Sequence, residues 1–208
     1  MGERGEGVGS GRLWRVLLAT ALGTFAVRFL FSGAFPFLID FSPEHLGHLW
    51  ERRIALLAHL AGGTVALLAG PFQLWSGVAG IRLGPHRWVG RVYVVAVLVG
   101  GSAAFYLSAY TQEFAKQMSL QALGVVWWTT TWKAYRAIRT GRESQHRTWA
   151  MRSYAVTFSF VIFRLGAEAG VLRTLGSEPV AVWILLSWVI PLLITEFMAR
   201  FRLRLAHL

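Results

Sequence analysis

The stretch HRWVGRVYVVAVLVGG, residues 86–101, joins a basic and aromatic head to a long apolar run. After Arg91 the chain carries no Lys, Arg, Asp or Glu until Glu113. A helix needs about 20 apolar residues to cross the hydrocarbon core of a bilayer. The stretch therefore predicts a membrane-spanning helix over residues 88–110 that begins at a His-Arg-Trp sequence.

Five further apolar stretches have the length of a membrane span, at residues 13–39, 51–75, 119–138, 149–171 and 179–199. The connections between them are short, so little of the chain lies outside a membrane. We therefore predict an all-α, polytopic membrane bundle of about six transmembrane helices, forming one domain over residues 13–208. Residues 1–12 are Gly-rich and polar, and we expect a disordered tail there.

The composition supports a membrane protein and excludes several classes of site. The chain is 55% hydrophobic and 15% charged, which is too apolar for a soluble domain of 208 residues. It has no Cys, which excludes thiolate catalysis, iron–sulfur clusters and covalent haem attachment. Hydrolase and nucleotide-binding signatures are absent, and the sequence indicates neither an enzyme class nor a metal site.

The positive charges indicate an orientation. Of the 21 Lys and Arg residues, 15 fall beside the termini and the connections that precede spans 88–110 and 149–171, against four on the opposite side. By the positive-inside rule, both termini face the cytoplasm, as in a multi-pass protein of the inner (plasma) membrane. The net charge of +11 is spread between apolar blocks, so we expect no nucleic-acid partner.

A second stretch, HRTWAMRSYAV at residues 146–156, nearly repeats the opening one. Trp88 and Arg91 are three residues apart, as are Trp149 and Arg152, so in both segments the guanidinium can lie over the indole. The histidines are offset by one residue between the two segments. The segments are therefore alike in chemistry without being a strict repeat.

Four arginines crowd the two helix starts, namely Arg87, Arg91, Arg147 and Arg152. One explanation is membrane topology, with the guanidiniums reaching lipid phosphates. The other is an anion site, at which they converge on a phosphate or on haem propionates. Glu196 can neutralise one of them, although Arg200 competes for it.

His86 and His146 admit three roles: structural residues at the interface, haem or metal ligands, and contacts to an anion or lipid. As axial ligands they would hold haem b between two helices, with the arginines on its propionates. His59 has no histidine on the fourth span to pair with. A second haem held by two histidines is therefore not expected.

Ionisable residues inside predicted spans form a second polar layer, made up of Arg28, His59, Arg164 and Glu168. Arg164 and Glu168 are four residues apart and can pair. One positive charge is then left over, which predicts a bound anion, lipid or quinone carbonyl, or a His59 kept neutral beside it. The alternative is a structural network that ties the first, second and fifth helices together.

Local patterns predict helix packing and a helix start. Small residues four apart, Gly62-Ala66-Gly70 and Gly166-Gly170, would let helices approach closely. Ser42-Pro43-Glu44 has the pattern of a helix start. His45 and His48 follow it, and we expect a solvated helix start there in preference to a metal site.

Three segments carry a family resemblance: HLAGGTVALLAGPFQL at 59–74, the opening stretch at 86–101, and HRTWAMRSYAVTFSFVIFRL at 146–165. They resemble the signature segments of a bacterial family of predicted multi-pass membrane proteins, the domain of unknown function 2306, over about residues 50–170. The chain departs from the pattern at Ala150. The resemblance implies a membrane protein without an assigned activity. A looser, architectural similarity to the cytochrome b561 and ferric reductase group implies haem b between histidines of neighbouring helices.

These observations favour a membrane redox protein that binds haem b or uses a quinone. The alternatives are a carrier or sensor of a lipid or small anion, and a structural or assembly subunit of a larger complex. For the last, the small-residue faces are the only support in the sequence. The ligand, the oligomeric state and the physiological pathway stay open at this point.

Overall fold

The computed structural model describes residues 17, 20–79, 84–170 and 177–205, with the side chains of a few helical residues outside the description. The predicted tail at 1–12 lies outside the described residues, as do Arg4, Arg12, Arg15, Arg82 and Arg173. For Glu168 the helical backbone is described and the side chain is not.

The described residues are helical with short turns between them and form no strand, so the all-α prediction is confirmed. The first helical segment covers residues 20–39 and includes the π-helical turn η1 (Leu30–Ala34) and α2 (Phe35–Ile39). The elements that follow are α3 (Pro43–Leu46), η2 (Gly47–Arg52), α4 (Arg53–Ala79), α5 (Gly84–Ser108), α6 (Phe114–Arg139), α7 (Glu143–Thr157), α8 (Ser159–Glu168) and α10 (Ser177–Leu205).

Four helical segments of the described chain are long and apolar enough to cross a membrane: Thr20–Phe37, Pro43–Gly77, Gly84–Ser108 and Val180–Arg200. The predicted span at 119–138 falls within α6, whose Thr, Gln and Lys side chains make it more polar. The predicted span at 149–171 is divided at Phe158 into α7 and α8, each shorter than a span. The count of six spans stays a prediction.

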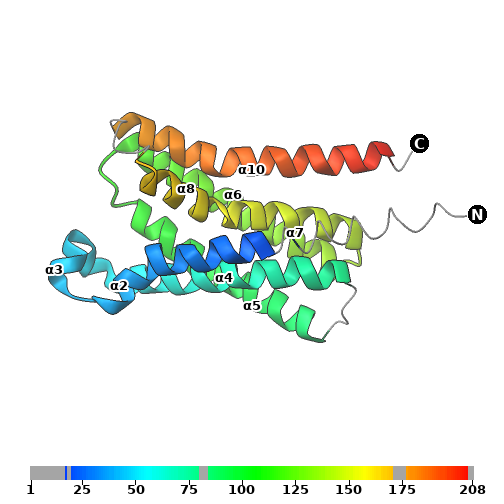
Figure 1. Ribbon diagram of the computed structural model, residues 1–208, viewed down its shortest axis with the longest axis horizontal. Helices are drawn as coiled ribbons and strands as arrows, with labels where there is room; N and C mark the ends of the chain where they lie inside the picture. Colours follow the sequence, from blue (N-terminus) through cyan, green and yellow to red (C-terminus); the bar gives the residue numbers. More distant parts are fainter. Residues whose placement is uncertain (1–16, 18–19, 80–83, 171–176, 206–208) are drawn as a thin grey trace, which may run out of the picture.

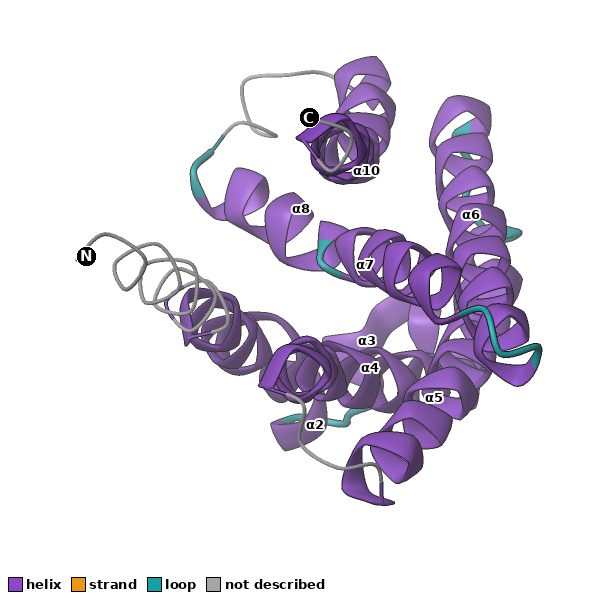
Figure 2. Cartoon of the chain, turned by 90° about the vertical axis from the view of Figure 1, so that its right-hand side faces the viewer, coloured by secondary structure: helices purple, strands orange, loops and turns teal. Residues whose placement is uncertain are grey.

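The long helices run side by side with short connections, as Figure 1 shows. Seen along their length in Figure 2, α7 and α8 lie between α10 on one side and α4 on the other. The helix α6 packs against α5, α7 and α10. The last turns of α4, the first turns of α5 and the α6–α7 connection lie at the same end of the bundle as the last turns of α10 (Figure 1).

That end is strongly basic, and we call it the basic end. Among the cations whose side chains the structure describes, nine lie at this end against three at the opposite, far end. They are Arg87, Arg91, Lys133, Arg136, Arg139, Arg142, Arg147, Arg152 and Arg200 at the basic end, and Arg52, Arg53 and Lys116 at the far end. The charge asymmetry expected from the sequence is thus present along the bundle.

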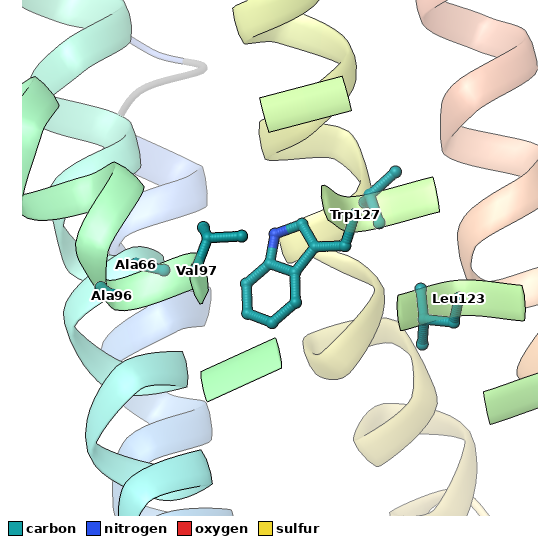
Figure 3. Packing of buried hydrophobic residues seen from close by; sticks show 6 residues of the cluster. Ala66, Ala96, Val97, Leu123 and Trp127 are labelled. Atoms are coloured by element: carbon teal, nitrogen blue, oxygen red, sulfur yellow. The ribbon is translucent and has the colours of Figure 1, made fainter. Parts of the chain in front are cut away.

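The core lies where α4, α5, α6 and α7 meet. Trp127 of α6 is its largest side chain, 1% exposed, and its indole lies beside Val97 in Figure 3. Large apolar side chains such as Ile54 and Leu193 are exposed on the outside of the bundle. Exposed apolar surface of this extent suits contact with lipid.

Glycines let the helices approach as the sequence predicted. A Cβ on Gly62 would lie 2.6 Å from the Ala96 carbonyl oxygen, and one on Gly70 would lie 1.9 Å from the Tyr154 ring. Gly166 packs in the same way against the Trp183 ring. Gly170 differs, because its φ of 76° places it in the turn after α8.

These close contacts are all made within one chain. The small-residue faces are therefore used internally, and they no longer support an assembly subunit. The predicted helix start is confirmed, since the Ser42 hydroxyl accepts the His45 N–H at 3.2 Å and Pro43 begins α3. His45 lies against Phe37 and 3.6 Å from Asp40.

Candidate functional site

The two histidine-led segments form the starts of α5 and α7 at the basic end. His86 lies in the first turn of α5, where its Nδ1 is 2.7 Å from the Ser76 hydroxyl of α4. Gln73 of α4 donates to the His86 carbonyl at 2.8 Å. His146 lies in the first turn of α7, with its Nδ1 2.9 Å from the carbonyl of Ala134 in α6.

The partner of each Nδ1 bears on which ring nitrogen carries the proton. A carbonyl only accepts, so Nδ1 of His146 donates to Ala134 and, in the neutral ring, Nε2 is an acceptor. Ser76 can donate its hydroxyl proton to the Gln73 carbonyl at 3.3 Å or to Nδ1 of His86 at 2.7 Å, and in the first case Nε2 of His86 is an acceptor as well. Nε2 of both rings has no hydrogen bond within the described part of the chain.

The two imidazoles lie near enough to interact electrostatically. Each is oriented through Nδ1 by a different neighbouring helix, an arrangement that also fixes metal-binding histidines in other proteins. Two Nε2 atoms from different helices are thus presented at one end of the bundle.

The four arginines of the two helix starts have different surroundings, and an anion site formed by all four stays a prediction. Arg152 pairs with Glu196 of α10, which also accepts from Arg200 at 2.9 Å. Arg147 lies 3.8 Å from Glu143 on its own helix. Arg87 and Arg91 are exposed on α5. Neighbouring carboxylates neutralise Arg147 and Arg152, whereas Arg87 and Arg91 lie on the exposed side of α5.

The expected stacking of Arg on Trp occurs in one segment. Arg152 lies 4.3 Å from the Trp149 ring centre, and Lys133 of α6 lies 4.4 Å from the same ring. Trp88 is 66% exposed and shows no such contact among the described residues. The prediction is confirmed for α7 and wrong for α5.

A buried cluster of hydroxyl groups, which we call the hydroxyl cluster, joins α5, α6 and α7. The Tyr93 hydroxyl lies 2.8 Å from both Ser153 and Thr157. The indole N–H of Trp127 donates to Thr157 at 2.8 Å, and the Thr131 hydroxyl lies 2.7 Å from Ser153. Sequence reasoning did not find this cluster. Its signal was the four-residue spacing of Ser153 and Thr157, and of Trp127 and Thr131.

The residues do not fit a haem buried between α5 and α7. The Nε2 atoms suit axial ligation, but Tyr93 closes the interface by direct hydrogen bonds to α7 about 10 Å along the helix from His86. Trp127 fills the space beside it, and two of the four arginines expected at the propionates are paired with carboxylates. No group of three or more metal-ligating side chains is found among the described residues.

The second polar layer is divided between two contacts. His59 donates from Nδ1 to the Gly100 carbonyl at 3.1 Å and lies edge-on to Phe160 of α8. Arg164 of α8 donates to the carbonyl of Ser32 at 2.8 Å, within the π-helical turn of the first helix. Arg164 thus ties the fifth predicted span to the first, whereas His59 of the second span hydrogen-bonds the third span and meets the fifth through the Phe160 ring.

A small pocket lies between the first helix and α8. It is lined by Arg28, Arg164, Ser32 and four apolar side chains, and its volume of about 10 Å³ suits a single water molecule. Arg28 and Arg164 both make further interactions within the chain, and the anion expected from the surplus positive charge of this layer stays a prediction. The expected Arg164–Glu168 pair falls on a side chain outside the description.

Comparison with known proteins places the chain in a family without identifying an activity. No curated protein and no solved structure matches it, and the looser similarity to cytochrome b561 thus gains no support. The family described as "Predicted membrane protein (DUF2306)" matches residues 56–199, more than half of the chain. The chain belongs to this family of predicted membrane proteins.

Proposed function

We propose that the protein binds a lipid-soluble quinol at the basic end through His86 and His146. The observation that supports this is the pair of imidazoles held through Nδ1 by α4 and α6, each with Nε2 left without a hydrogen bond among the described residues. A quinol carries two hydroxyl donors on a small ring and reaches a membrane protein from the bilayer. Each hydroxyl can donate to one imidazole.

The geometry favours this ligand over the two others that the sequence suggested. A haem needs an open interface between α5 and α7, and the hydrogen bonds of Tyr93 to Ser153 and Thr157 close that interface. A quinone carbonyl needs a donor, whereas Nε2 of neutral His146 accepts, so the reduced form is the better match. Arg28 and Arg164 lie in the second polar layer, where Arg164 already donates to the Ser32 carbonyl.

Quinol binding can be measured by quenching of tryptophan emission during titration with a short-chain quinol. We expect His146→Gln and His86→Gln to weaken binding about tenfold each, the loss of one hydrogen bond to a buried hydroxyl, or about 1.4 kcal/mol. His45→Gln, at the far end, is the control and should bind as the wild type does. Equal affinity in all four proteins would reject the proposal.

An absorption spectrum of the same preparation separates quinol from haem. We expect no α-band after reduction of the purified protein. A reduced α-band that is lost in His146→Gln would replace the quinol with haem b, held at the edge of the bundle.

We also propose that the basic end faces the cytoplasm, in the inner membrane, from the excess of Lys and Arg there. The chain contains no Cys, so single substitutions can report sidedness without background. Glu44→Cys at the far end should react with an impermeant maleimide on intact cells, and Arg139→Cys should react only after lysis. The reverse pattern would overturn the orientation.

A further inference from the structure

One face of α5 combines a basic head with an apolar stripe, and we call it the α5 stripe. It begins at the basic end and consists of Arg87, Trp88, Arg91, Val95, Leu98 and Val99. All six residues are exposed, with Trp88 the most exposed of the four apolar ones and Val95 exposed by 58%. They follow the three- and four-residue spacing that places residues on the same side of a helix.

No described element covers this face. The helix α5 packs principally against α4 and α6, and the inward side of α5 is formed by Tyr93, Val97 and Gly100. The stripe lies on the side away from these residues. It therefore faces the surroundings of the bundle, which for an apolar segment are lipid.

The dimensions and charges of the stripe match one leaflet of a bilayer. At 1.5 Å per residue, Arg91 and Val99 are about 12 Å apart along α5, close to half of the 30 Å hydrocarbon core. Arg87 and Arg91 are one turn apart and have no carboxylate partner within the described part of the chain. Trp88 lies between them, at the level where indoles meet the glycerol region.

We propose that the α5 stripe binds an anionic phospholipid. Arg87 and Arg91 hold the phosphate, Trp88 packs beside the glycerol, and one acyl chain lies along Val95, Leu98 and Val99. The equivalent arginine of α7 does not take part, because Glu196 already neutralises Arg152. This site is separate from the proposed quinol site, since its side chains lie on the opposite side of α5 from Tyr93.

An anionic lipid fits this site better than a zwitterionic one because their headgroups differ in charge. Each Lys or Arg near a membrane surface attracts anionic headgroups, whereas a choline group adds a positive charge beside the guanidiniums. The excess of cations at the basic end acts in the same direction. Selectivity between phosphatidylglycerol and phosphatidylcholine is therefore the property to measure.

The test uses the full-length protein, with retained lipids counted by native mass spectrometry from mixtures of phosphatidylglycerol and phosphatidylcholine. We expect the wild type to retain phosphatidylglycerol selectively and the double variant Arg87→Gln/Arg91→Gln to lose this preference by roughly tenfold. Arg136→Gln/Arg139→Gln removes the same charge from exposed sites on α6 and should keep the preference. The temperature of thermal unfolding in phosphatidylcholine bilayers should be the same for the wild type and the two double variants.

Two results would overturn the proposal. An equal loss of preference in both double variants would show a general charge effect without a site on α5. Displacement of phosphatidylglycerol by millimolar inorganic phosphate would show a site for a free anion in which the apolar stripe takes no part.

Discussion

The segments at residues 86–95 and 146–156 carry nearly the same sequence, yet their side chains have different surroundings. In the second segment Trp149 is contacted by two cations and Arg152 pairs with Glu196. In the first segment Trp88 and Arg91 are exposed. Val95 is 58% exposed and its counterpart Val156 is 0% exposed.

The difference comes from the neighbours of each helix. The helix α7 lies between α6 and α10, which supply Lys133 and Glu196 to its basic residues. The outward face of α5 has no such neighbour. Both tyrosines nevertheless point inward, where Tyr93 reaches α7 and Tyr154 donates to the Leu67 carbonyl of α4. The shared sequence thus defines the inward contact, and the packing of the helices decides the role of the Trp and Arg.

The largest effect is expected at the glycine beneath Tyr154. Gly70→Ala places a methyl group 1.9 Å from the tyrosine ring, which forces the ring or the helix to move, and should lower the free energy of unfolding by about 3 kcal/mol. Thermal unfolding in one detergent measures the change. Gly63→Ala is the control, because a Cβ there has no neighbour within 4 Å, and it should be neutral or stabilising.

The next largest difference in stability is expected between variants of Arg152 and Arg91. Arg152→Gln leaves Glu196 with the exposed Arg200 alone and removes the ion pair to α10, so we expect a measurable loss in the free energy of unfolding. Arg91→Gln in the same detergent should change it by less than about 0.5 kcal/mol. Equal losses would contradict the different roles of the two arginines.

A smaller difference in the free energy of unfolding is expected between variants of Tyr93 and Tyr154. Tyr93→Phe removes two hydrogen bonds of 2.8 Å, and we expect a loss of about 1.5 kcal/mol. Tyr154→Phe removes one longer bond of 3.2 Å, with an expected loss of about 0.5 kcal/mol. Chemical denaturation of both variants tests the order, and a larger loss at Tyr154 would place the stronger contact on α4.

The smallest effect is expected at the first tryptophan. Trp88→Ala should alter the free energy of unfolding in detergent by no more than about 0.5 kcal/mol, since its side chain packs mainly against the surroundings. Trp149→Ala removes two cation–π contacts and should cost about 1 kcal/mol more. The two melting curves, measured side by side, provide the comparison.

The sequence predicted those features that depend on one segment at a time. Apolar runs located the helices, small-residue spacing located Gly62 and Gly70, and the position of Glu196 indicated its ion pair. No local sequence pattern indicated that the predicted span at 149–171 would divide at Phe158 into α7 and α8. The hydroxyl cluster and the different surroundings of the four arginines depend on which helices become neighbours, and a single sequence does not contain that information.

The most direct test compares equivalent positions of the two segments. The chain has no Cys, so nitroxide labels can be attached at Val95→Cys and Val156→Cys and studied by electron paramagnetic resonance in bilayers. We expect a mobile label at residue 95 that collides frequently with oxygen dissolved in the lipid. At residue 156 we expect an immobilised label that oxygen scarcely reaches. Equal mobility and equal oxygen access at the two positions would contradict this expectation.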